Sequence, residues 1–279
     1  MDENVRWTEP GCELKAELED MEKRNRLKWM GHCLKYCEEI DSTNTEAKRL
    51  AASGACHGTV VVANRQTAGK GRRGRMWESP ADSGIFMTFL LRPKVDVQKI
   101  SMLTLVAALA VSKAVSEETG CICQIKWPND LVMDGRKICG ILTEMGTSGS
   151  QIQYAVVGIG INVGQQEFPE ELREKATSLC MQTKTPVSRV KLIERVLEAF
   201  EKYYDDWAVH GDMRLLRREY EGQLVNLGRE VMVLAPEGEY PGVASGICDT
   251  GELLVKTADG SVKKILSGEV SVRGVYGYV

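Results

Sequence analysis

Apolar and polar positions along the chain predict alternating strands and helices. Residues 59–63 and 85–91 are short β-branched or apolar runs, and residues 151–163 form another, all typical of strands. Residues 98–119 are apolar on most faces of a helix, which indicates a helix buried against a sheet. Residues 187–209 and 213–222 have an amphipathic helical pattern. The central part of the chain is therefore expected to be a sheet covered by helices.

The pattern changes at both ends of the chain. From about residue 224, short strands are separated by glycine-containing turns, which predicts a small all-β module. Residues 13–26 could form a short polar helix with little apolar face to bury, so the N-terminal region is interpreted as a tail or linker. These patterns divide the chain into a tail at 1–33, a main domain at 34–223 and a β domain at 224–279.

Composition narrows the functional classes. The net charge is −3, from 36 cations and 39 anions, so nothing overall suggests nucleic acid as a partner. We find no window of about 20 apolar residues, so no membrane span is expected. The nine cysteines include no C-x-x-C pair and the three histidines are scattered, which argues against zinc. We interpret the cysteines as free thiols in a reducing cytoplasm, mostly acting as small apolar residues.

Residues 66–75 are the most informative stretch, because three glycines alternate with four cations between two predicted strands. Glycine lets the backbone approach a ligand closely, and Lys and Arg supply charge for phosphate or carboxylate. The run lacks the spacing of a nucleotide-triphosphatase phosphate loop. By composition alone, a solvated basic turn or a nucleic-acid patch would explain it equally well.

Three further blocks accompany this loop in one order: Asp41-Ser42-Thr43-Asn44 before it, then Lys126-Trp127-Pro128-Asn129-Asp130, then Gly158-Ile159-Gly160-Ile161-Asn162. The set resembles the biotin protein ligases, whose hallmark is a G-R-G-R-R-G loop followed by K-W-P-N-D and G-x-G-x-N. The resemblance implies an α+β fold, with a mixed β-sheet flanked by helices as in class II aminoacyl-tRNA synthetases, followed by an SH3-like barrel. It also implies formation of biotinyl-5′-AMP from biotin and ATP with Mg²⁺, then transfer of biotin to a lysine of a biotin carboxyl carrier protein.

The resemblance assigns residues to each part of that reaction. Lys137 and Arg72 are the expected catalytic cations, near the biotin carboxylate and the α-phosphate, and Asp130 is expected to hold Mg²⁺ through water. The expected biotin-binding residues are Ser42, Thr43, Asn44, Gln66, Lys70, Gly71, Arg72, Lys137, Gly158 and Gly160. The expected nucleotide-binding residues are Arg72, Arg75, Trp77, Lys126, Asn129, Lys137 and Asn162.

Plainer interpretations stay open for several of these residues. Ser42, Thr43 and Asn44 are also good helix N-caps, and Trp77 could be ordinary core packing. Lys70 replaces a commoner Arg and loses its forked donors. Gly268-Glu269 resembles a family turn that reaches the nucleotide, although a plain turn explains it as well.

Two other functions remain as alternatives. A lipoate protein ligase shares the fold and the chemistry, but a lipoyl head would leave the ureido-binding residues Ser42 and Gln66 without a purpose. A biotin-responsive transcriptional repressor, or the remnant of one, is disfavoured by the mild acidity of the chain and its short N-terminal segment. The resemblance leaves open a homodimer formed through a sheet edge.

Overall fold

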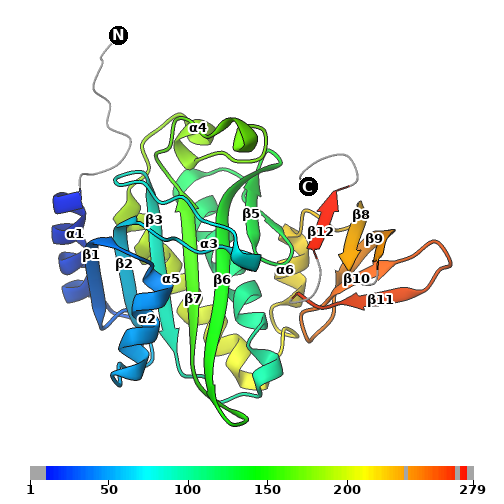
Figure 1. The fold of residues 1–279 in the computed structure, drawn as a ribbon, viewed down its shortest axis with the longest axis horizontal. Helices are drawn as coiled ribbons and strands as arrows, with labels where there is room; N and C mark the ends of the chain where they lie inside the picture. The colour runs from blue at the N-terminus through cyan, green and yellow to red at the C-terminus, as the bar shows by residue number, and fades with distance from the viewer. Residues whose placement is uncertain (1–10, 236–237, 268–270, 275–279) are drawn as a thin grey trace.

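The computed structural model describes residues 11–235, 238–267 and 271–274, and its centre is a seven-stranded mixed sheet (Figure 1). Its strand order is β1-β2-β3-β7-β6-β5-β4. Strands β1 and β2 are parallel, and the remaining neighbours are antiparallel. The bounds are β1 Leu34–Ile40, β2 Thr59–Gln66, β3 Gly84–Leu91, β4 Gln124–Lys126, β5 Asp130–Met133, β6 Arg136–Ser148 and β7 Gln151–Asn162. The expected mixed sheet is confirmed.

Helices cover both faces of this sheet, and the twofold alternation along each strand decides what each face packs against. In β3, Met87 and Phe89 join the main core, whereas Leu90 packs in a smaller cluster under α2 (Thr43–Ala52). Helices α3 (Met102–Thr119) and α5 (Arg189–His210) pack together behind the sheet (Figure 1). The α2 side is only partly covered, and the candidate site lies there.

Helix α3 has the length and mean hydropathy that would allow a helix to cross a membrane, which the lack of a window of about 20 apolar residues did not anticipate. Its span with the preceding turn, residues 97–119, is 72% buried within the fold. Residues from Leu103 to Val111 are all buried between the sheet and α5. Burial against protein on all sides explains why a helix of a folded core can be apolar all round.

The described part of the N-terminal segment, from Gly11 onward, is not an undocked tail. Helix α1 (Gly11–Arg24) buries Leu14, Leu18 and Met21 against α5 and β1. The expectation that this helix has little apolar face to bury was therefore wrong. Its three apolar residues follow the i, i+4, i+7 spacing of a single helical stripe, which charged neighbours surround.

A second, antiparallel sheet of five strands follows the main domain, with strand order β11-β10-β9-β8-β12. Two short helices, α4 (Leu179–Thr183) and α6 (Arg217–Gln223), precede it. The strands are β8 Glu230–Ala235, β9 Gly238–Ile247, β10 Leu253–Lys256, β11 Val262–Ile265 and β12 Ser271–Gly274. The expected small all-β domain is confirmed. It touches the main domain where Trp127 Nε1 donates to the Gly251 carbonyl at 3.1 Å.

Candidate functional site

Three glycines form the floor of a pocket on the α2 side of the sheet. Gly140 of β6 is paired with Gly160 of β7, and Gly158 lies two residues earlier on the same face. A Cβ at Gly160 would lie 2.5 Å from Trp77 Nε1, and one at Gly158 would lie 2.1 Å from Asn44 Oδ1. Only glycine permits these approaches, so the G-x-G block makes a hollow where other strand positions would place side chains.

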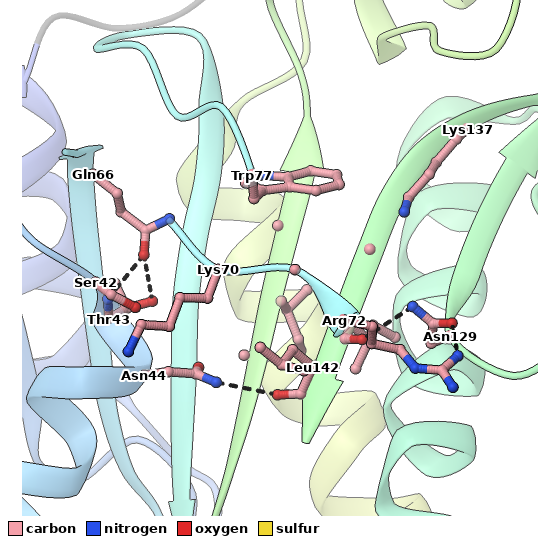
Figure 2. A pocket seen from close by; sticks show the side chains of 16 residues that line it. Ser42, Thr43, Asn44, Gln66, Lys70, Arg72, Trp77, Asn129, Lys137 and Leu142 are labelled. Carbon is pink, nitrogen blue, oxygen red and sulfur yellow. Dashed lines mark hydrogen bonds between the residues drawn. The ribbon is translucent and has the colours of Figure 1, made fainter. Parts of the chain in front are cut away.

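One end of the pocket, called the neutral end here, is rich in uncharged hydrogen-bonding groups, and the Lys70 amine lies beside them (Figure 2). Ser42 is the N-cap residue of α2, yet its side chain makes no capping hydrogen bond. Thr43 donates to Gln66 Oε1 from its backbone N–H at 2.8 Å and from its hydroxyl at 3.0 Å. A carbonyl oxygen has two lone pairs, so Gln66 can accept a ligand N–H only if the Thr43 hydroxyl turns away.

Two residues that the sequence interpretation missed hold this end in place. Thr88 of β3 is completely buried, and its hydroxyl lies 2.8 Å from Thr43 Oγ1 and 2.7 Å from Asn44 Oδ1. Glu144 of β6 accepts from Asn44 Nδ2 at 2.8 Å and from Lys48 Nζ at 2.5 Å. Burial acts to raise the pKa of Glu144, but these two donors outweigh it and hold that pKa below its usual value. Asn44 is thereby fixed as an ordered wall of the pocket.

The opposite end of the pocket is cationic. Lys137 Nζ lies 2.6 Å from a carboxylate oxygen of Asp130, and 5.1 Å from the centre of the Trp77 ring. Arg72 donates to Asn129 Oδ1 at 2.6 Å and also to the backbone carbonyl of Ser267. Burial lowers the pKa of the Arg72 guanidinium, while the nearby Asp130 acts in the opposite direction. Two cations thus face an enclosed space, as binding of an anion requires.

The site comprises two adjoining cavities that meet at Arg72 and Asn129. The inner pocket has a volume of about 50 Å³, and the outer cavity, under the basic loop, about 840 Å³. The side chains that line the inner pocket include those of Ser42, Thr43, Asn44, Gln66, Lys70, Arg72, Trp77, Asn129, Lys137 and Leu142 (Figure 2). A volume of this size holds only a few water molecules. Entry of a larger ligand therefore requires part of the lining to move.

Trp77 is the part of the lining that lies over the glycine floor. Its indole lies over Gly160 and Gly140, where added Cβ atoms would be 2.5 and 2.8 Å from the ring, and Figure 2 shows it between the loop and Lys137. Its Nε1 is buried without a hydrogen-bond partner among the residues that the structure describes. A buried polar atom without a partner costs roughly 1–3 kcal/mol, so this position of Trp77 is easily given up to a ligand. The adenine contact predicted for Trp77 stays a prediction.

The basic loop folds back on itself over the cavities. Residue pairs Gln66–Ser79 and Lys70–Met76 form antiparallel bridges at its stem. Lys70 reaches Thr45 Oγ1 at 3.1 Å and lines both cavities, and Arg75 lines only the outer one. Gly71 is also part of both walls. The loop therefore places its cations above the pocket that the glycine floor defines.

Three residues predicted for the site, Lys126, Asn162 and Asp130, lie outside the walls of both cavities. Lys126 is buried, and neither Lys126 nor Asn162 belongs to the wall of either cavity. Asn162 donates to the Thr177 carbonyl at 3.1 Å and accepts from Gln165 at 3.3 Å. The nucleotide roles of both residues stay predictions. Asp130 lies just behind Lys137, and the turn at Gly268-Glu269 is outside the described residues.

A glycine-floored pocket with a neutral polar end and a cationic end, under a basic loop on a mixed sheet, defines a ligase that acts on a small carboxylate. Comparison with family models agrees: residues 36–162 match the biotin/lipoate A/B protein ligase family, and residues 227–273 match the biotin protein ligase C-terminal domain. The chain belongs to the biotin protein ligases.

Individual relatives support this assignment along most of the chain. It is 40% identical over 263 residues to the bifunctional ligase/repressor BirA of Bacillus subtilis, covering 92% of this chain and 80% of the relative. It is 32% identical over 270 residues to the biotin–[acetyl-CoA-carboxylase] ligase of Mycobacterium tuberculosis, covering 92% and 96%. The solved biotin protein ligase from Aquifex aeolicus in complex with biotin and ATP aligns with a TM-score of 0.76 at 35% identity, covering 87% and 99%.

Proposed function

We propose that this protein is a biotin–[acetyl-CoA-carboxylase] ligase, which joins biotin to a carrier lysine at the expense of ATP. The observation that carries the proposal is the polarity of the inner pocket. Ser42, Thr43 and Gln66 lie at its neutral end, and Lys137 and Arg72 lie at its cationic end. Biotin has a neutral ureido ring at one end and a carboxylate at the other, so it matches this polarity in one orientation.

The neutral end would bind the ureido ring. That ring presents two N–H donors and one carbonyl acceptor, and a buried polar ligand needs all three satisfied. The Ser42 hydroxyl, which makes no capping bond, can donate to the carbonyl, and Gln66 Oε1 can accept an N–H once the Thr43 hydroxyl turns. The glycine floor lets the flat bicyclic ring lie close to β6 and β7.

The cationic end would favour the first chemical step. The biotin carboxylate attacks the α-phosphorus of ATP, pyrophosphate leaves, and biotinyl-5′-AMP forms. Two anions must approach one another for this reaction, and at an effective dielectric constant of about 20 two unit charges 4 Å apart repel by about 4 kcal/mol. Lys137 and Arg72, placed between them, offset that repulsion. The outer cavity, which the loop covers, has room for the nucleotide.

The second step needs a nucleophile from the partner. The carrier lysine amine, once it has lost its proton, attacks the acyl carbon of the mixed anhydride, the amide forms and AMP leaves. We propose that the acceptor is the carboxyl carrier domain of a biotin-dependent carboxylase and that the reaction takes place in the cytoplasm.

Mg²⁺ would be held by Asp130, with Asn129 beside it. Among the residues that the structure describes, no group of three His, Cys, Asp or Glu side chains is arranged for a metal ion. One carboxylate still fits Mg²⁺, which commonly binds through one or two carboxylates and the substrate phosphates. When bound, the ion would neutralise phosphate charge, and Lys137 would then be released from its contact with Asp130.

Mass spectrometry of a carrier domain tests the proposal. The domain is incubated with the protein, ATP, Mg²⁺ and either biotin or lipoate. The expected result is one biotinyl group on a single lysine in the biotin reaction alone. Lipoylation instead would move the assignment to a lipoate ligase, and an unmodified intact carrier in both reactions would contradict ligase activity.

A further inference from the structure

Two cysteines outside the pocket form a close pair at the start of the first two strands. Cys33 directly precedes β1, and Cys56 lies in the turn that leads into β2. Because β1 and β2 are parallel, their starts lie side by side, and Val60 N–H donates to the Cys33 carbonyl at 2.9 Å. The two Sγ atoms are 3.4 Å apart, and both residues are exposed. The interpretation that the cysteines serve mostly as small apolar residues does not describe these two.

The surroundings of the pair shift the pKa values of its two thiols in opposite directions. The Thr59 hydroxyl lies 3.4 Å from Cys56 Sγ. This hydroxyl, the Cys33 thiol and the charge of Arg92 lower the pKa of Cys56. The contact with Cys56, partial burial and the Glu22 carboxylate raise the pKa of Cys33. Cys56 is therefore the thiol that reacts first, and Cys33 is positioned to react with it afterwards.

We propose that Cys33 and Cys56 are a redox-modification site, which forms a reversible intramolecular disulfide when the protein meets a small-molecule disulfide such as oxidised glutathione. The Cys56 thiolate attacks one sulfur of oxidised glutathione, forms a mixed disulfide and expels one glutathione thiolate. Cys33, after losing its proton, attacks Cys56 Sγ and expels the second. Two protein thiols are oxidised and one molecule of oxidised glutathione is reduced to two of glutathione.

The position of the pair predicts what the disulfide does. Each strand begins at the cysteine pair and ends at the pocket, where Ser42 and Gln66 lie. Seven residues of β1 span roughly 23 Å, at about 3.3 Å per residue. The disulfide would close the loop that contains β1 and α2, and closing a loop stabilises a fold by restricting the unfolded chain. We therefore expect Tm to rise by a few degrees, and biotinylation activity to change less than twofold.

The test uses the full chain in buffers of increasing oxidised-to-reduced glutathione ratio. Free thiols are blocked by alkylation, and intact mass and peptide mapping follow. We expect a cross-linked Cys33–Cys56 peptide with the loss of two hydrogens, reversed by a reductant. Cys33→Ser and Cys33→Ala should stop at one glutathionyl group on Cys56. Cys121→Ser, a change at a half-buried cysteine, is the matched control and should cross-link as the unaltered protein does.

Three results would overturn the proposal. One is a Cys56 mixed disulfide that persists in the unaltered protein as it does in Cys33→Ser. Another is that both thiols stay reduced, and are therefore alkylated, at glutathione ratios at which other cysteines of the chain are already oxidised. The last is a disulfide that joins either residue to a different cysteine. The readout is independent of ligase activity, so failure here leaves the proposed function intact.

Discussion

Arg72 is a partly buried guanidinium whose partners, Asn129 and the Ser267 carbonyl, are neutral. An anion that replaces them gains a charge-assisted hydrogen bond of about 1.5–3 kcal/mol. Arg72→Gly should therefore release biotinyl-5′-AMP about 10–100-fold faster, since 1.4 kcal/mol is tenfold. The measurement is the rate at which labelled adenylate leaves the purified complex.

Arg73→Gly is the matched control for that experiment. Arg73 is exposed and has a left-handed φ of 57°, which glycine adopts without strain. Its adenylate release should stay at the rate of the unaltered protein. Equal release rates for all three proteins would show that Arg72 does not hold the adenylate.

Thr88 is expected to influence biotin binding by positioning the two residues that it contacts, Thr43 and Asn44. Thr88→Val keeps the shape but removes the hydroxyl that lies against Thr43 and Asn44. We expect KM for biotin to rise about fivefold at nearly unchanged kcat, because one buried hydrogen bond is worth about 1 kcal/mol. Thr88→Ser keeps the hydroxyl and should restore KM. A fall in kcat alone, with KM unchanged, would contradict this positioning role.

The sequence predicted residues of the pocket wall better than the residues that support them. Ser42, Gln66, Arg72 and Lys137 belong to local blocks and were found, and all four line the pocket. Thr88 and Glu144 lie outside those blocks, on strands whose side-chain contacts with α2 only the fold reveals. No local pattern marks them.

At the scale of elements, Glu201 of α5 holds the segment that connects α1 to β1. Its carboxylate accepts from the backbone N–H groups of Lys28, Trp29 and Met30 at 3.0, 2.9 and 3.0 Å. Burial acts to raise the pKa of Glu201, but these three donors outweigh it and the pKa lies below its usual value of 4.5. The ionised form is thus favoured by folding.

Glu201→Gln should lower the free energy of unfolding at pH 7 by about 2 kcal/mol, the typical worth of a hydrogen bond to a charged group. Because the folded-state pKa is depressed, this contribution is present above pH 4.5 and is lost as pH falls through the folded-state pKa. Urea unfolding of both proteins at pH 7 and at acidic pH measures the difference. A difference that did not shrink in acid would contradict an ionised Glu201.

The elements themselves were largely predictable, and the failures have physical causes. Strands β2 and β3 and helix α3 follow strong apolar patterns. Helix α1 was misjudged because three apolar residues among many charges looked too few to bury, and only the groove beside α5 shows that they suffice. Local patterns report how apolar a stripe is, and not whether a complementary surface exists.

At the scale of the whole molecule, the basic loop lies between the two domains. Arg72 of the loop donates to the Ser267 carbonyl, two residues beyond the end of β11, and Trp127 donates to the Gly251 carbonyl. The sequence predicted two domains but gave no sign of these contacts, because they join segments more than a hundred residues apart. The position of the loop therefore depends on both domains.

Hydrogen exchange of residues 69–75 should report ligand binding. Arg73, Gly74 and Arg75 are exposed and have few apolar anchors, so their amides should exchange quickly without ligand. Biotin with ATP should slow this exchange at least tenfold, because the anionic product gives the cations a partner. Helix α5, which packs with α3 behind the sheet, is an internal control and should change little. Equal exchange with and without ligand would contradict loop closure.

A crystal structure of the protein with bound biotin would test the account most directly. We expect the ureido ring at Ser42 and Gln66, the carboxylate between Lys137 and Arg72, and the indole of Trp77 moved off Gly160. Biotin bound elsewhere, with Trp77 still on Gly160, would contradict the assignment of the glycine-floored pocket as the biotin site.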